Sequence, residues 1–250
     1  MVWIKALFGS KNSPRVSEAE PPLQAGQATL SWEDIVVPGA KALETVLALR
    51  GTQSAGTPVA LGDDDDLQRV LETLECNDSS TEEIIRAGEA LDVDGWLKDR
   101  IAAAPDYYQE DEPGSSADSE PVQAPSLSLA FDVLSGKPKV KMHVALVPTA
   151  KPWEVPAYLK IGNWNECPAA EVHVAFFKSW FERYGACVTG IGPDTVEFSV
   201  ANPPRTMEDA RRLAHEQFVY CADIVHQGVQ SVENLAKVLQ NSGNWYFWWD

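Results

Sequence analysis

Apolar and polar side chains alternate in several short stretches of the chain, which is the pattern of half-buried strands. In the second half, one stretch covers 127–133 and another 140–146, with the turn sequence 135–138 between them. We expect these two stretches to form an antiparallel hairpin. A third alternating stretch, 195–200, follows the turn at 192–194, and a short, largely apolar run at 57–61 predicts a strand in the first half.

Helical periodicity accounts for most of the remaining apolar residues, which recur every three or four positions. Several of the predicted helices carry recognisable caps or glycine stops. The predicted helices cover 38–50, the segment directly after the aspartates at 63–66, a segment opening at Thr81, one around Trp96, one from Pro168 to Gly185, one from Thr206 to Gly228 and one from Ser231 to Gly243.

Composition divides the chain into four regions. Residues 9–29 are rich in Ser, Pro, Glu, Gln and Gly without periodicity, and we expect a mobile arm at 1–29. We expect a mostly helical acidic region at 30–104, an acidic linker or long loop at 105–125 and an α+β domain at 126–250. The predicted fold class is α+β, with a helical or mixed acidic N-terminal half and a C-terminal antiparallel or mixed sheet packed with helices.

Five consecutive aromatic residues, 245–249, precede Asp250. A soluble protein seldom exposes a contiguous aromatic patch, because each buried ring removes about 150–250 Å² from water. We therefore expect either a last strand locked into the core or a docking surface. In a strand, Trp245, Phe247 and Trp249 would share one face, which we expect to be buried.

The formal net charge is −17, and the charged residues are distributed unevenly along the chain. Residues 1–125 carry 24 acidic and nine basic side chains, whereas residues 126–250 carry 13 and 11. Such a field repels a nucleic-acid backbone and favours encounter with a basic protein partner. The alternative is an acidic surface that only keeps the protein in solution.

No apolar run is long enough to span a bilayer, and the short apolar stretch 1–8 is a poor signal peptide. The four cysteines contain no CxxC pair and indicate no disulfide framework. We expect a cytoplasmic protein with no nucleic-acid or membrane partner and no cofactor, and the oligomeric state stays open.

Four consecutive aspartates stand between the strand at 57–61 and the next helix. Carboxylates at a helix N-terminus accept hydrogen bonds from free amides and interact favourably with the dipole, so helix capping is the first interpretation. An acidic contact patch is the second, and a metal site is the third, although neither EF-hand nor zinc spacing is present. The predicted partner-binding residues are Asp63, Asp64, Asp65, Asp66, Glu110, Asp111 and Glu112.

An enzymatic interpretation depends on Cys167 and His173. Cys167 stands just before a predicted helix N-terminus, where a thiolate is stabilised, and His173 lies on that helix. A cysteine–histidine nucleophile is therefore conceivable. Against it, Cys-Pro at a helix start is also an ordinary buried corner, and no nucleophile motif surrounds Cys167.

A succession of short sequences in the second half is distinctive. Its members are LVPT at 146–149, GNWNECP at 162–168, Trp180, YGA at 184–186, two prolines at 203–204, the helix at 214–223 and the aromatic end at 245–250. This succession resembles an uncharacterised bacterial family, domain of unknown function 4253, chiefly over residues 140–250. The resemblance implies a bacterial cytoplasmic protein and brings no reaction or catalytic residues.

The leading hypothesis is a non-enzymatic binding protein of the immunity type, which neutralises a basic bacterial toxin or effector. It depends on the acidity of the first half and on the lack of a catalytic constellation. One alternative is a cysteine-dependent hydrolase or transferase that uses Cys167 with a histidine. The other is a structural or scaffold domain.

Overall fold

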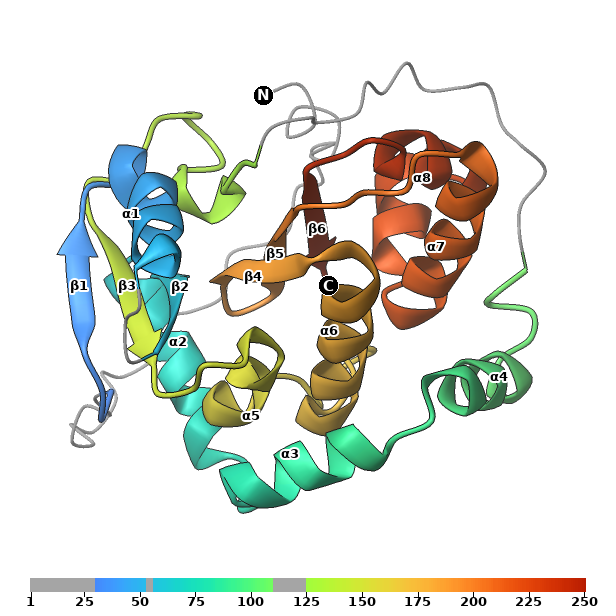
Figure 1. The fold of residues 1–250 in the computed structure, drawn as a ribbon, viewed down its shortest axis with the longest axis horizontal. Helices are drawn as coiled ribbons and strands as arrows, with labels where there is room; N and C mark the ends of the chain where they lie inside the picture. The colour runs from blue at the N-terminus through green and yellow to red at the C-terminus, as the bar shows by residue number, and fades with distance from the viewer. Residues whose placement is uncertain (1–29, 53–55, 110–124) are drawn as a thin grey trace, which may run out of the picture.

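The computed structural model describes residues 30–52, 56–109 and 125–250 (Figure 1). Within these residues the centre is a six-stranded mixed sheet with the strand order β1-β3-β2-β4-β5-β6. All neighbouring strands are antiparallel except β2 and β4, which are parallel. The predicted α+β class is confirmed. The strands are β1 (Asp34–Val37), β2 (Thr57–Gly62), β3 (Met142–Val147), β4 (Ala186–Ile191), β5 (Thr195–Val200) and β6 (Asn244–Trp248).

Helices cover both faces of this sheet. Most of them lie where the apolar periodicity predicts them, and none in the described part of the chain is long and apolar enough to cross a membrane. The helices are α1 (Gly39–Gly51), α2 (Asp64–Glu75), α3 (Thr81–Ala90), α4 (Val93–Ala103), α5 (Val155–Leu159), α6 (Ala170–Tyr184), α7 (Met207–Tyr220) and α8 (Val232–Leu239).

Strand β2 shows how the two faces are separated. All six of its residues are buried, yet they alternate between two cores. Val59 and Leu61 belong to the large core with α6, α7 and α8, whereas Ala60 belongs to a smaller core with α1. The regions 30–104 and 126–250 therefore contribute strands to the same sheet, since β1 and β2 pair with β3 and β4.

The aromatic stretch forms strand β6 and closes the large core. Trp245, Phe247 and Trp249 are each 2% exposed or less, while Tyr246, on the opposite face, is 39% exposed. Phe247 stacks on Trp180 of α6, with ring centroids 5.1 Å apart and the planes 5° from parallel. The prediction that one face of this strand is buried is confirmed.

The predicted hairpin at 127–146 forms only around its turn, where Phe131 and Pro138 make an isolated antiparallel bridge and the Asp132 amide donates to the Lys137 carbonyl at 2.8 Å. Only its second half is a strand, β3, and it pairs with β1 and β2 instead. The first half forms a 3₁₀ turn, Ser128–Ala130, whose backbone amides at Ser128 and Leu129 donate to the Glu197 carboxylate over 2.7 and 2.8 Å. Because those amides are already paired, Leu127 and Leu129 pack in the smaller core without joining the sheet, whereas Val133 and Val140 are exposed.

The predicted helix from Thr206 to Gly228 is also interrupted. It begins at the expected cap, where the Thr206 hydroxyl accepts from the Asp209 amide, but it ends at Tyr220. Cys221 is extended, and a π-helical turn, Ile224–Val229, follows. Apolar spacing could not show this break, because the buried residues continue on both sides of it.

Removal of residues 245–250 should abolish soluble, cooperatively folded protein. A milder test is Phe247→Ala, which should lower the free energy of unfolding by about 3–5 kcal/mol, as expected for loss of a buried aromatic ring. Tyr246→Ala is the matched control, because its ring is partly exposed, and it should cost far less. Urea unfolding followed by circular dichroism measures both. Equal stability of the two variants would show that the strand is not part of the core.

Stability should also depend on the protonation of Glu197, which is 1% exposed. Burial raises its pKa to about 7, although the amides of Ser128 and Leu129 favour the charged form. Since the pKa of Glu197 is higher in the folded protein than in the unfolded chain, the stability that Glu197 contributes is greatest at low pH and is lost as the pH rises through 7. The loss between pH 4.5 and 8 should be on the order of 3 kcal/mol.

The Glu197→Gln variant isolates this effect, because its side chain cannot ionise. Urea unfolding of both proteins at several pH values should show a stability difference that changes between pH 4.5 and 8. A difference that is constant over this range would contradict the prediction.

Candidate functional site

The four aspartates begin helix α2 and cap it. Asp63 accepts hydrogen bonds from the amides of Asp65 and Asp66, both at 3.1 Å, and the Asp66 carboxylate accepts from the Asp63 amide at 3.1 Å. This reciprocal pair is a capping box. The capping interpretation is confirmed, and the same geometry explains why acidic residues occupy the first turn.

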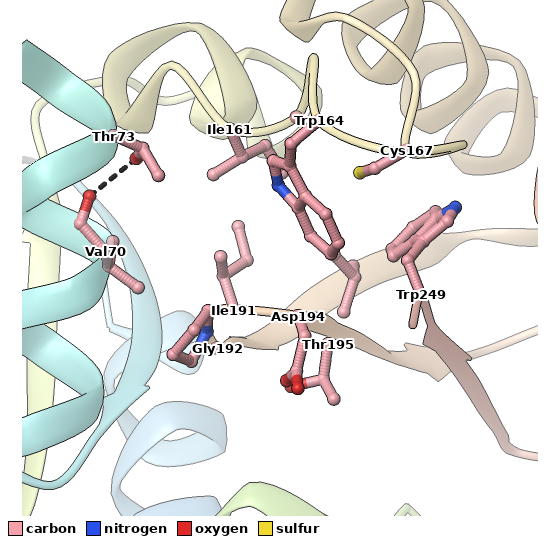
Figure 2. Close-up of a pocket in the computed structure, with 13 residues that line it drawn as sticks. Val70, Thr73, Ile161, Trp164, Cys167, Ile191, Gly192, Asp194, Thr195 and Trp249 are labelled. Carbon is pink, nitrogen blue, oxygen red and sulfur yellow. Dashed lines mark hydrogen bonds between the residues drawn. The ribbon is translucent and has the colours of Figure 1, made fainter. Parts of the chain in front are cut away.

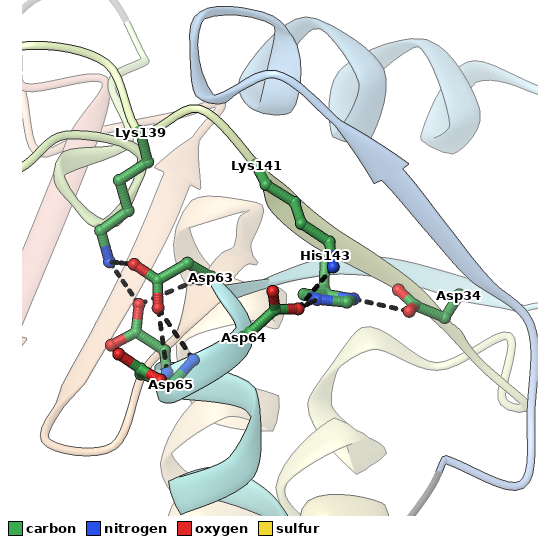
Figure 3. Close-up of polar contacts among 8 residues, drawn as sticks. Asp34, Asp63, Asp64, Asp65, Lys139, Lys141 and His143 are labelled. Carbon is green, nitrogen blue, oxygen red and sulfur yellow. Dashed lines mark hydrogen bonds and ion pairs between the residues drawn. The ribbon is translucent and has the colours of Figure 1, made fainter.

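Cations from the approach to β3 neutralise most of this turn (Figure 3). Lys139 forms ion pairs with Asp63, at 3.0 Å, and with Asp66. Lys141 lies 2.6 Å from Asp64, which also contacts the Nε2 atom of His143.

The other ring nitrogen of His143, Nδ1, lies 2.6 Å from a carboxylate oxygen of Asp34 on β1. The imidazole therefore bridges β1 and the start of α2. Of the predicted contact residues, Asp65 alone is exposed and has no ion pair with another described residue. Glu110, Asp111 and Glu112 lie outside the described residues.

A different set of carboxylates forms no ion pairs with other described residues. They lie on α2, on α4 and on the turns and helix between them; in Figure 1, α3 is at the bottom of the molecule and α4 is at the right. Each is exposed and has no hydrogen bond or ion pair to another described residue. We call this set the acidic strip: Glu72, Glu75, Asp78, Glu82, Asp92, Asp94 and Asp99.

Cys167 and His173 do lie side by side. The Cys167 Sγ atom is 3.5 Å from His173 Nε2, and His173 Nδ1 is hydrogen-bonded to the Tyr220 hydroxyl. Gly162 makes the approach possible, because a Cβ there would lie 1.8 Å from the Pro168 oxygen and 2.7 Å from His173 Nε2.

The protonation states of Cys167 and His173 differ from those of a nucleophilic dyad, in which the cysteine is a thiolate. Burial raises the pKa of the Cys167 thiol and lowers the pKa of His173 to about 3, so both groups are neutral at pH 7. The expected stabilisation of a thiolate by the helix N-terminus is therefore wrong, since α6 starts at Ala170 and desolvation dominates.

The tautomer of His173 also argues against a nucleophilic dyad. Burial raises the pKa of Tyr220 well above its ordinary value, so its hydroxyl stays protonated, and His173 is its hydrogen-bond partner. If that hydroxyl donates to Nδ1, the ring proton is on Nε2, beside the Cys167 sulfur and the Pro168 carbonyl, which is also a hydrogen-bond partner of the ring. An Nε2–H group cannot accept the thiol proton.

Cys167 also lines a narrow pocket (Figure 2). Its cavity volume is only about 20 Å³, which is room for about one water molecule. Its walls are mainly apolar, with Trp164 and Trp249 on either side of Cys167. Among the described residues, no group of three or more His, Cys, Asp or Glu side chains is arranged to hold a metal ion.

Comparison with known families gives one match. Residues 143–250 match the model of a family described as a domain of unknown function, DUF4253, which confirms the resemblance seen in the second half. The matched segment contains Cys167, His173 and Tyr220, whereas the acidic strip lies before it. No curated protein and no solved structure matches the chain.

Sequence reasoning placed Cys167 near His173 but missed Tyr220 and the pocket. Tyr220 is 47 residues from His173, and only the packing of α7 against α6 brings them together. The strip was missed for another reason. Four consecutive aspartates are a stronger local signal than scattered carboxylates, and the lysines that neutralise them lie more than 70 residues away.

Thiol reactivity should follow burial. Cys76 is exposed and should react with a disulfide reagent such as DTNB in the native state. Cys167 and Cys221 are buried, and burial raises both thiol pKa values, that of Cys221 to about 12, so neither should react before unfolding. Mass spectrometry of the labelled peptides identifies the sites. Fast labelling of Cys167 in folded protein would instead indicate an activated nucleophile.

Proposed function

We propose that this protein is a non-enzymatic, cytoplasmic binding protein of the immunity type, which neutralises a basic bacterial toxin or effector. The observation that carries the proposal is the acidic strip, a row of exposed carboxylates with no partners among the described residues. The segment 64–103 carries 12 acidic side chains against four basic ones, Arg69, Arg86, Lys98 and Arg100. Such an excess of one charge steers an oppositely charged protein and raises the rate of association.

Helix stability accounts for only part of this strip: Glu82, Asp92 and Asp94 stand at helix N-termini, where the dipole favours a carboxylate. Glu72 and Glu75 lie in the last turn of α2, which contains no basic residue. A carboxylate there faces the negative end of the helix dipole, at a cost of some tenths of a kcal/mol. Asp63 and Asp66, by contrast, are explained by capping and by Lys139. The strip is therefore the better candidate for recognition than the four aspartates.

The contact between Cys167 and His173 favours a second candidate function, a cysteine-dependent hydrolase or transferase. It ranks lower because both groups are neutral and Tyr220 fills the position of an orienting residue without a charge. Replacement of Cys167 by Ala should leave partner neutralisation intact in a normally folded variant. Loss of activity in such a variant would put the enzymatic function first.

The binding proposal is tested with a partner captured from the native bacterium by pull-down. Association is measured by stopped flow across a salt series for wild type and for Glu75→Gln/Glu82→Gln. We expect the on-rate to fall with salt, and to be about two- to fivefold lower in the variant at low salt, because steering is lost.

The matched control is Glu182→Gln/Glu208→Gln, which makes the same change in net charge at exposed positions on α6 and α7. Its on-rate should be close to that of wild type, because a change in net charge away from the strip has only a small effect on steering. Equal rates for all three proteins would refute steering by the strip. Asp63 is unsuitable for this test, because its replacement also removes the cap of α2.

A further inference from the structure

A short segment, 126–130, which we call the strap, crosses β4, β5 and β6 on the side of the smaller core. Its first amide donates to the Asn244 side chain of β6 at 3.1 Å, and its next amides donate to Glu197 of β5. Over β4 it is anchored by Leu127, which is 2% exposed. A Cβ at Gly190 would lie 2.6 Å from the end of that leucine, so the glycine leaves room for the anchor.

Glu197 is a buried carboxylate whose partners in the strap are uncharged. Each of its two oxygens accepts one backbone amide, from Ser128 at 2.7 Å and from Leu129 at 2.8 Å. It forms no ion pair with a described residue. A buried charge without a counterion costs free energy, and water would solvate it. Because the strap lies directly on both oxygens, release of the strap would open the carboxylate to water.

The other ionisable groups on this face do not neutralise Glu197. Tyr246 of β6 is its cross-strand neighbour, and burial and the charge of Glu197 raise the pKa of that hydroxyl. Asp194 carries a charge of the same sign and raises the pKa of Tyr246 further. Arg50 of α1 donates to a serine hydroxyl of β5 and to a carbonyl of β4, and burial raises the pKa of Cys187 beside it. Glu197 is the member of this set to which the strap is hydrogen-bonded.

The strap can move without disruption of the sheet. None of the described strand pairings involves 126–129. The next residue, Ala130, is held in place, because its carbonyl accepts from the Lys139 amide at 2.8 Å and its side chain is buried. Ala130 is therefore the hinge at which a local opening of the strap would end.

We propose that the strap is a proton-controlled latch, which stays closed over β4, β5 and β6 while Glu197 is protonated and opens when that proton is lost to water. This inference does not depend on the proposed binding function. The amides of the strap favour the charged form of Glu197, but burial outweighs them and raises its pKa to about 7. In the open state the side chain is hydrated, and its pKa returns to about 4.3.

The sign of the pH dependence follows from these two states. Since the pKa is lower in the open state, a rise in pH favours opening. The equilibrium constant for opening should increase about 50- to 100-fold between pH 5 and pH 8.

The first experiment measures hydrogen exchange of the Ser128 and Leu129 amides by NMR. Protection factors, which are corrected for the intrinsic effect of pH on exchange, report the opening equilibrium. In wild type they should fall about 50- to 100-fold from pH 5 to pH 8. In Glu197→Gln they should be constant, because a carboxamide does not ionise. The matched control is Glu182→Gln, an exposed position on α6, which should keep the wild-type dependence.

Constant protection in wild type, or the same fall in Glu197→Gln, would overturn the latch. Amides of α6 report global unfolding for comparison. The strap amides should exchange faster than these and respond little to low urea, because a local opening exposes little surface. If both sets show the same protection and the same urea dependence, the strap opens only when the whole protein unfolds, and the proposal fails.

The second experiment weakens the apolar anchor. Leu127→Ala should lower the protection of both strap amides tenfold or more at pH 5, because a buried leucine no longer holds the strap. Leu47→Ala, at an exposed position on α1, is the matched control and should leave protection unchanged. Circular dichroism shows whether each variant is folded. Unchanged protection in a folded Leu127→Ala protein would show that the strap is not held in this way and would overturn the proposal.

Discussion

The aromatic packing around Trp180 is the interaction on which the rest of the fold depends. Its indole is fully buried and contacts rings from three other elements: Phe198 of β5, Tyr220 of α7 and Phe247 of β6. These residues are separated by up to 67 positions in sequence, so no local structure can satisfy them. The face of the sheet is covered only when α6, α7 and β6 are all in place, and this requirement fixes the order of the strands at this end.

That packing uses aromatic side chains that would otherwise be available for recognition. Trp245, Phe247 and Trp249 face inward, and Trp249 reaches the surface only as a wall of the pocket. In the proposed function, recognition depends on charge on the outer helices. Exposed charge acts over about a Debye length, ~8 Å at physiological salt.

Much of the fold could be predicted from local pattern. Helices α1, α3 and α6 follow from apolar spacing and end signals, and strand β6 follows from alternation within the aromatic run. The failures have a common cause in contacts that are distant in sequence. The Glu197 carboxylate binds the amides of Ser128 and Leu129, which therefore cannot pair within a hairpin. Strand β1 is only four residues long and was not predicted, because it forms through its pairing with β3.

The candidate site shows the same limit. The residue types were informative, since a cysteine six positions before a histidine can reach it across a helix start. Their protonation states were not, because these depend on how completely α6 and α7 exclude water. Charge was predictable as a total, but its distribution between paired and free carboxylates depends on Lys139 and Lys141, which come from another part of the chain.

The strand order has a consequence for the family segment. Within the sheet, β2 lies between β3 and β4, yet β2 precedes residues 143–250 in the chain. A protein that carried this segment alone would have β3 detached from β4, with unpaired backbone groups on both strands. In this chain, the matched segment therefore depends on β2, from the preceding sequence, to complete the sheet. The family boundary thus cuts through a structural unit and leaves out its middle strand.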